Sequence, residues 1–307
     1  MADITVIGSF VLDMVAHVDE FPKPGESMLG KSVNFYPGGK GINQCVAAAR
    51  LGAKTEMIGM LGADANGAVF RKLMTEEGIK SGSVFECGVP TAVAQIQINN
   101  ASENQIVMIP SANFEFSPSN LKSVENKIEQ TEFVLTQLEL NREVNSLIIS
   151  TCKRLGTPLI LNPAPAYKLS EKELGSVAYL TPNETELEIL TGLPTDTDEQ
   201  AIIAARKLLD MGVKNVVATL GKRGALIVNA DGARAVSGYS VKAVDTVAAG
   251  DSFNGALARC LVMGMPLDEA VRFANAVGAL TVTKPGAIPS LPYLKEVESF
   301  INKHEHK

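Results

Sequence analysis

Short apolar runs alternate with longer amphipathic stretches along most of the chain. The apolar runs predict buried strands at 4–8, 134–138, 159–161, 179–181 and 216–219. The amphipathic stretches predict helices at 42–51, 145–155, 184–191, 199–211, 252–263 and 267–277. Because strands alternate with helices, we expect an α/β fold with a mainly parallel central sheet and helices on both of its faces.

Two early parts of the chain do not follow this alternation. Residues 11–36 read as short strands joined by turns rich in proline and glycine. Residues 92–98 and 105–109 read as a hairpin around a polar segment. No repeat or linker divides the chain, so we expect a single domain, 1–307, that carries a small β insertion formed by about 11–36 and 90–110.

Composition narrows the class of protein. The net charge of −6 and the pI near 5.3, without any cluster of Lys and Arg, argue against nucleic acid or an anionic membrane as a partner. No apolar run approaches the roughly 18 residues of a membrane-spanning helix, and the first residues lack the basic flank of a signal peptide. The four cysteines are scattered, which indicates reduced thiols in a cytoplasmic protein rather than a disulfide or zinc framework.

One formal motif match is rejected on its context. Residues 25–32 fit the pattern GxxxxGK[ST] of a phosphate-binding P-loop. A P-loop lies between a strand and a helix, because the helix N-terminus helps to bind the phosphates. Here prolines precede the match, and the segment after it stops at Pro37-Gly38-Gly39, which leaves no room for a helix. We interpret residues 25–32 as an exposed turn in the β insertion.

The segment 244–255 carries the strongest chemical signal. Its small residues Ala248, Ala249 and Gly250 directly precede a predicted helix, whose first N–H groups would be free to bind an anion such as phosphate. Asp251 follows, at or beside the N-cap of that helix. From the local pattern alone, this residue is either a catalytic group or simply a helix cap.

Two other segments present polar groups beside rigid or glycine-rich backbone. In residues 36–44, three glycines allow the backbone to approach a ligand closely, while Lys40 and Asn43 supply donors for hydroxyl groups. The alternative is an ordinary junction between a loop and a helix. Residues 161–166 contain Asn-Pro-Ala-Pro-Ala, whose prolines set a rigid turn at the end of a strand.

The last two segments suggest a metal and a nucleotide. Asn183 and Glu186 lie three residues apart at the start of a helix, where their oxygens could reach hydrated Mg²⁺ or could cap the helix. Residues 219–224 follow a strand and could pass under a nucleotide or form a hairpin turn. Four of the five segments lie at the ends of predicted strands, where open α/β sheets bind ligands.

Other catalytic systems lack their signatures. None of the three histidines is placed for a Ser-His-Asp triad, and the sequence contains no GxSxG elbow. It also contains no GxGxxG fingerprint of a dinucleotide-dependent dehydrogenase.

Taken in order, these segments resemble the ribokinase (PfkB-type) family of carbohydrate kinases. The resemblance runs from Gly8 to Ser290 and rests on Gly-Gly-Lys-Gly-Xaa-Asn at 38–43 and Asp-Thr-Xaa-Ala-Ala-Gly-Asp at 245–251. Asn-Pro-Ala-Pro-Ala and Thr-Pro-Asn-Glu lie between these two signatures. The implied fold is ribokinase-like, with the β insertion as a lid over a sugar, and such proteins often form homodimers through this lid.

The resemblance also implies an activity and a set of roles. The enzyme would be an ATP-dependent kinase acting on the primary hydroxyl of a sugar, with an anion hole at Ala248, Ala249 and Gly250 and with Asp251 as general base. Sugar-binding roles carry over to Asp13, Gly39, Lys40, Asn43 and Glu139. Nucleotide-binding roles carry over to Asn183, Thr219, Gly221, Gly224 and Asn275. Glu186 would help to hold Mg²⁺. A monovalent cation, K⁺, would bind at Asp245, Val247, Thr281, Lys284, Gly286 and Ser290.

One position departs from the ribokinase pattern. Ribokinases typically carry Asn two residues before the sugar-binding Asp, whereas Val11 occupies that position here. The deoxyribokinase branch, which the segment 182–192 also resembles, has an apolar residue there. The substrate is therefore expected to be a free pentose, ribose or 2-deoxyribose. The alternatives are another sugar, a nucleoside, or a sugar-binding regulatory protein without catalytic activity.

Overall fold

The computed structural model describes residues 1–101 and 103–305. Within these residues, the larger sheet has nine strands in the order β13-β12-β11-β10-β9-β8-β1-β4-β5. The strands are β1 (Ile4–Ile7), β4 (Thr55–Gly62), β5 (Lys80–Cys87), β8 (Phe133–Thr136), β9 (Leu159–Leu161), β10 (Tyr179–Leu180), β11 (Asn215–Thr219), β12 (Gly224–Asn229) and β13 (Gly232–Ser237). Neighbouring strands from β5 to β11 are parallel, and β12 and β13 extend the sheet antiparallel. The expected mainly parallel sheet is confirmed.

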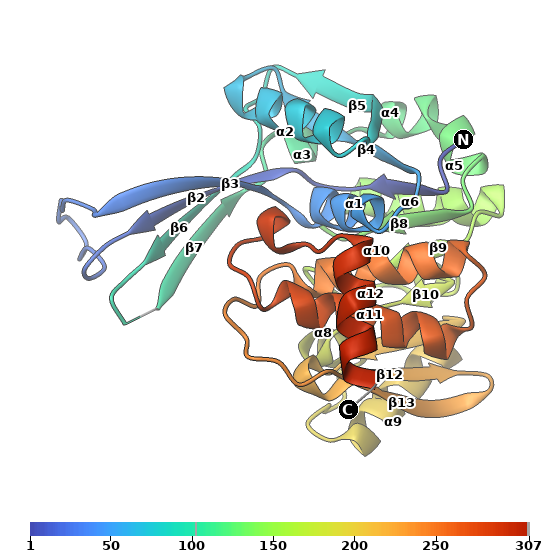
Figure 1. The fold of residues 1–307 in the computed structure, drawn as a ribbon. Coiled ribbons are helices and arrows are strands. Elements are labelled where there is room, and N and C mark those ends of the chain that lie inside the picture. Colours follow the sequence, from blue (N-terminus) through green and yellow to red (C-terminus); the bar gives the residue numbers. More distant parts are fainter. Residues whose placement is uncertain (102, 306–307) are drawn as a thin grey trace.

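Helices cover both faces of this sheet (Figure 1). One face packs against α1 (Lys40–Arg50), α2 (Ala65–Glu76), α10 (Ala249–Val262), α11 (Leu267–Thr281) and α12 (Leu294–Glu305). The other face packs against α3 (Ala112–Glu115), α4 (Pro118–Ser123), α5 (Glu125–Glu129), α6 (Arg142–Leu155), α7 (Glu171–Leu174), α8 (Glu184–Thr191) and α9 (Asp198–Asp210). Strand residues point alternately into the two apolar layers, which explains why the central strands read as continuous apolar runs.

The β insertion forms a separate sheet that projects from the body (Figure 1). Its strands are β2 (Val11–His17), β3 (Ser32–Gly38), β6 (Val93–Ile98) and β7 (Asn104–Ile109), in the order β3-β2-β6-β7. The expected hairpin at 92–109 is therefore present. Residues 25–31 lead into β3 and not into a helix, so the rejection of the P-loop is confirmed.

The structure also corrects the sequence analysis at several elements. Strands β4 and β5 and helix α2, which lie between residues 55 and 87, were not expected, and neither was the antiparallel pair β12–β13. Helix α10 begins at Ala249, three residues before the expected start. Asp251 therefore lies inside the first turn of the helix and not at its N-cap, which is Ala248.

Candidate functional site

The candidate residues gather where the order of the strands reverses. Strand β1 lies between two strands that come later in the sequence. On one side is β4, which follows the first part of the insertion, and on the other is β8, from which the chain continues outward to β9, β10 and β11. Open parallel sheets bind ligands at the carboxyl ends of their strands at such a switch point. The segments that follow β1, β8, β9 and β10 all reach this edge. The topology therefore brings the motifs at 161–166 and at Asn183–Glu186 to the same edge as Ser9 and Glu139.

Glycines allow the N-terminus of α1 to lie directly against the end of β1. Gly39 has a φ of 98°, a left-handed conformation that side chains disfavour. A Cβ on Gly41 would lie 2.4 Å from the backbone nitrogen of Ser9, so only glycine fits there. The backbone N–H of Ile42 donates to the carbonyl oxygen of Ser9 at 3.1 Å. This contact presents the polar residues at the start of α1 to the switch point.

Glu139 is the buried acidic centre of this region. Its Oε2 accepts hydrogen bonds from the backbone N–H of Lys40, at 3.0 Å, and from the Ser9 hydroxyl. Burial raises the pKa of Glu139 despite the nearby Lys40 ammonium. Burial and then the charge of Glu139 raise the pKa of Asp13 to about 6. Asp13 and Glu139 therefore form an acidic pair suited to accept hydrogen bonds from ligand hydroxyls.

Lys40 is surrounded by acidic side chains. Burial alone would lower the pKa of this amine. The carboxylates of Asp251, Glu139 and Glu186 outweigh burial and raise its pKa, so Lys40 stays charged. A charged amine among these groups can bind an anion or a hydroxyl oxygen.

Asp251 lies buried at the start of α10, with 8% of its surface exposed. Its Oδ2 accepts from Nδ2 of Asn43 at 2.9 Å, and its Oδ1 accepts from Nε2 of Gln44 at 3.0 Å. Its side chain does not cap the helix. The interpretation of Asp251 as a simple helix cap is therefore wrong, because its carboxylate is held across the interface between α10 and α1.

Most of the backbone before Asp251 remains available to a ligand, since the N–H of Ala249 makes only a long hydrogen bond, of 3.4 Å, to the carbonyl oxygen of Thr246. Ala248 has a φ of 60°, an uncommon conformation for a residue with a side chain, and no side chain caps the helix that starts after it. The first N–H groups of a helix have no intrahelical partner. Gly250 is exposed, and a Cβ there would meet open space. This helix terminus can therefore bind an anion beside a buried carboxylate.

One buried oxygen at the site lacks a protein partner. Among the described residues, Oδ1 of Asn43 forms no hydrogen bond, although Nδ2 of the same side chain holds Asp251. An unpaired buried acceptor costs about 1–3 kcal/mol. A ligand hydroxyl could remove this cost, which fits a polyhydroxylated ligand beside Asp251.

The five positions assigned to a nucleotide lie at the ends of β10 and β11 and on α11. Thr219 forms an isolated parallel bridge with Asn183. Residues 219–224 join two antiparallel strands, so the hairpin interpretation is correct, with Gly221 and Gly224 both at positive φ. The amide nitrogen of Asn275 already donates to the carbonyl oxygens of Val236 and Ser237.

Glu186 takes part in a capping arrangement, one of the two interpretations left open. Its carboxylate accepts from the N–H of Asn183, and the Asn183 side chain accepts from the N–H of Glu186. Its pKa is raised by burial, and the charges of Lys40 and Asp251 also act on it, so it faces the candidate site. Within the described part of the chain, Asp, Glu, His and Cys side chains nowhere gather in threes as a metal site.

The residues assigned to a monovalent cation lie on two neighbouring loops. The Asp245 carboxylate accepts from the N–H of Val247 at 3.0 Å and from the N–H of Gly286 at 2.9 Å. Asp245 thus joins the loop before α10 to the loop after α11. Thr281 and Ser290 are buried, whereas the Lys284 ammonium pairs with Glu296 at the surface.

Ser9, Gln44 and Asn162 also lie in the site, although the motifs in the sequence predict no role for them. Ser9 donates to Glu139, and Gln44 donates to both Asp251 and Asn162. Gln44 is fully buried. The sequence offers one signal for the role of Gln44: it is a polar residue on a helix whose following residues are apolar and buried.

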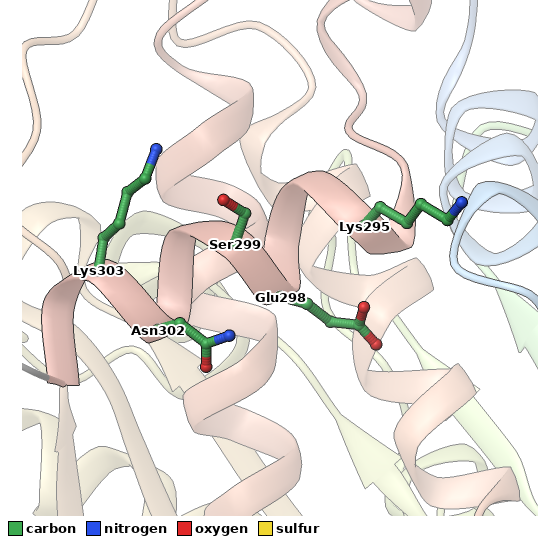
Figure 2. Close-up of a pocket in the computed structure, with 5 residues that line it drawn as sticks. All are labelled: Lys295, Glu298, Ser299, Asn302 and Lys303. Atoms are coloured by element: carbon green, nitrogen blue, oxygen red, sulfur yellow. The ribbon is translucent and has the colours of Figure 1, made fainter.

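An open hollow along α12 is lined by Lys295, Glu298, Ser299, Asn302 and Lys303, which extend from the outer side of one helix without converging (Figure 2). In the described residues, no helix combines the length and the apolar character needed to cross a membrane.

Comparison with known proteins agrees with this geometry. The model of the pfkB family of carbohydrate kinases matches residues 1–294. The chain is 39% identical to a ribokinase of Haemophilus influenzae over 97% of this chain and 98% of the relative, and 34% identical to a deoxyribokinase of Salmonella typhi over 99% and 100%. A ribokinase structure from Thermotoga maritima superposes with a TM-score of 0.90 at 36% identity, covering 98% of this chain and 100% of the other. The Arabidopsis thaliana ribokinase complexed with ribose and ATP superposes with a TM-score of 0.91 at 32% identity, covering 98% of each chain.

Proposed function

Since the chain belongs to the pfkB family of carbohydrate kinases, we propose that it transfers the γ-phosphoryl group of ATP to the 5-hydroxyl of a free pentose, ribose or 2-deoxyribose. The observation that carries the proposal is the buried Asp251 carboxylate, held by two amide donors beside an uncapped helix N-terminus. Relatives described as ribokinase and deoxyribokinase, and a ribokinase structure with ribose and ATP, support the choice of substrates.

In this proposal, Asp251 is the general base. Its carboxylate accepts the proton of the 5-hydroxyl as the hydroxyl oxygen attacks the γ-phosphorus, and the bond from that phosphorus to the leaving oxygen of ADP breaks. The N–H groups at Ala248, Ala249 and Gly250 donate to the phosphoryl oxygens. The helix terminus thereby stabilises the negative charge on these oxygens without having to rearrange. Phosphoryl transfer needs alignment and charge neutralisation, which this fixed arrangement would supply.

The sugar would lie between the small sheet and the start of α1. Asp13 and Glu139 would accept hydrogen bonds from its hydroxyls, and the unpaired oxygen of Asn43 would accept one more. Lys40 would donate to an oxygen, and Gly39 would allow the sugar to approach the backbone. The complete set of donors and acceptors favours a free pentose over a nucleoside, in which the base replaces one of the sugar hydroxyls.

ATP would extend along the ends of β10 and β11, with contacts at Asn183, Thr219, Gly221, Gly224 and Asn275. Mg²⁺, when bound, would neutralise phosphate charge. Glu186 is the protein group that would help to hold it, since Mg²⁺ is often bound through one carboxylate, water and substrate phosphates. K⁺ would bind between the two loops that Asp245 joins, with Ser290 and the backbone carbonyls of Val247, Thr281, Lys284 and Gly286.

Val11 favours 2-deoxyribose within the pentose class. Its side chain is 4% exposed and packs with Ala92, Ala94 and Ile96, on the same face of the small sheet as Asp13. The face of the small sheet beside Asp13 is thus an apolar wall. A ribose 2-hydroxyl against this surface would lose a hydrogen bond, at a cost of about 1–3 kcal/mol.

We further propose that the small sheet acts as a lid and joins two copies of the chain in a homodimer. The face that points away from Asp13 exposes Val33, Phe35, Val107 and Ile109, with 40% to 59% of each residue accessible. A second lid covering this face would remove these apolar side chains from water.

The cytoplasmic location expected from the cysteine spacing remains a prediction that cell fractionation would test.

The test is a coupled assay of ADP release with ribose, 2-deoxyribose, fructose, other pentoses and nucleosides. We expect turnover with a free pentose, and a loss of kcat by at least roughly 10²–10⁴-fold in folded Asp251→Asn. Turnover only with a nucleoside or a hexose would show that the substrate is not a free pentose. Sugar binding without ADP release would indicate a regulatory protein on this fold. A folded Asp251→Asn variant that keeps more than about a tenth of the wild-type kcat would remove the base role.

A further inference from the structure

A chain of buried polar side chains lies behind Asp251 and ends at the first turn of its own helix. Nε2 of Gln137 donates to Oε1 of Gln44 at 2.6 Å, and Nε2 of Gln44 donates to Oδ1 of Asn162 at 3.0 Å. Nδ2 of Asn162 donates to the carbonyl oxygen of Thr181 at 3.2 Å. The Thr181 hydroxyl donates to Asn254, whose Nδ2 donates to the carbonyl oxygen of Gly250.

Gln44 is the member of this chain that contacts the Asp251 carboxylate. Its Nε2 donates to Oδ1 of Asp251 at 3.0 Å, in addition to its bond with Asn162. Asn43 holds the other carboxylate oxygen, so each oxygen of Asp251 receives one amide hydrogen bond. Two fixed donors on different oxygens define the plane in which the carboxylate lies.

The network allows the Gln44 amide only one orientation. Two acceptor oxygens, of Asp251 and Asn162, face its NH₂ group, and the donor nitrogen of Gln137 faces its oxygen. A flipped amide would place its oxygen against two acceptors, one of which is the Asp251 carboxylate, a group that can only accept. Because Gln44 has no exposed surface, water cannot compensate for these lost hydrogen bonds.

We propose that Gln44 is a positioning residue that sets the orientation of the Asp251 carboxylate for proton transfer. The proposal rests on the proposed role of Asp251 as general base. Gln44 itself has no exposed surface, so we do not expect it to contact the ligand. Its removal should therefore slow the chemical step and leave ligand binding almost intact.

The experiment compares Gln44→Met, which keeps the length of the side chain and removes the donor, with Gln44→Asn, which keeps an amide and withdraws it from Asp251. The control is Thr136→Val, which removes a buried hydrogen bond to the carbonyl oxygen of Ile7 at the end of the neighbouring strand β8. For each variant, kcat and KM are measured with the best pentose, and calorimetry gives its dissociation constant. Urea unfolding gives the stability of each variant.

We expect folded Gln44→Met to lose about 10- to 100-fold in kcat, the loss typical of a misplaced reacting group, with KM and the dissociation constant changed by less than about threefold. Gln44→Asn should lose kcat in the same way, and it decides the matter if Gln44→Met does not fold. Thr136→Val should lose stability and keep its kcat.

Two results would overturn the inference. The first is a kcat within about threefold of wild type in folded Gln44→Met and Gln44→Asn. The second is an equal loss of kcat in Thr136→Val, which would mean that any loss of buried hydrogen bonding slows the enzyme. If Asp251→Asn is inactive while the Gln44 variants are active, only the positioning role fails. If Asp251→Asn is itself active, the proposed base fails first.

Discussion

Gly255 sets the distance between α10 and α1, and its replacement by alanine tests how closely these helices must pack. A Cβ on Gly255 would lie 2.6 Å from the carbonyl oxygen of Gln44, 2.7 Å from the Cβ of Ala47 and 2.9 Å from the nitrogen of Ala48. Ordinary contact begins at 3.4 Å, so the helices must separate by about 0.8 Å to accept the methyl group.

This separation has two measurable consequences. Overpacking of this kind costs about 1–3 kcal/mol, and the better helix propensity of alanine returns about 0.5–1 kcal/mol. We therefore expect Gly255→Ala to lose up to about 2.5 kcal/mol in its free energy of unfolding. The hydrogen bonds from Asn43 and Gln44 to Asp251, at 2.9 and 3.0 Å, would lengthen beyond a useful distance. The kcat should then fall by about 10- to 100-fold.

Gly278→Ala is the matched control, because Gly278 also lies in a helix of this layer. A Cβ there would lie 3.6 Å from the carbonyl oxygen of Ala249, which is ordinary contact. This variant should gain about 0.5–1 kcal/mol and keep its kcat. Urea unfolding and steady-state kinetics measure both variants. A Gly255→Ala protein with wild-type stability and wild-type kcat would refute the argument that close helix packing holds the carboxylate.

Four further outcomes are expected. The folded-state pKa of Asp13, about 6 against 3.8, means that the folded protein binds more protons than the unfolded chain between these values, so stability falls as pH rises through this window. Asp13→Asn should remove this fall, so the unfolding free energy of the variant relative to the wild type should rise between about pH 4 and about pH 6 and level off above this range; a difference independent of pH would contradict the assignment. Val11→Asn should raise kcat/KM for ribose relative to 2-deoxyribose by about 5- to 150-fold, and an unchanged ratio in parallel assays would exclude the apolar-wall argument. The wild type should turn over faster in K⁺ than in Na⁺ or a large organic cation at equal ionic strength, and Asp245→Ala should lose the difference; equal rates of the wild type in all three salts would count against the cation site. Phe35→Glu should convert the dimer into a monomer by light scattering, whereas Val69→Glu, at an exposed position of α2, should not; a wild-type monomer would rule out the dimer.

Much of the sheet could be predicted because its central strands are buried on both faces and read as apolar runs. The elements between residues 55 and 87 gave weaker patterns. Gly59 and Gly62 interrupt β4, and α2 buries only Gly67, Phe70 and Met74, so its apolar face is narrow. The pair β12–β13 is antiparallel and departs from the alternation of strand and helix on which the prediction rested.

The site likewise contains residues that the sequence predicts and residues that it does not. The motifs around Lys40 and Asp251 could be located, because glycine and small residues before a helix have a physical meaning in the sequence itself. The contact of Gln44 with Asp251 could not be, because it depends on the distance between two helices. That distance is set by Gly255. A glycine inside a helix does not show in the sequence which other helix it allows to approach.

The site can form only late in the synthesis of the chain. The hydrogen bond from Asn43 to Asp251 joins residues 208 positions apart, and the bond from Ser9 to Glu139 joins residues 130 apart. Strand β1 is made first, yet it gains its neighbour β8 only after residue 133 and its helix α10 only after residue 249. A ribosome-bound chain that lacks α10 therefore exposes the polar face of α1 without its partner. The appearance of kinase activity in a synchronised translation reaction would report the completion of the whole fold.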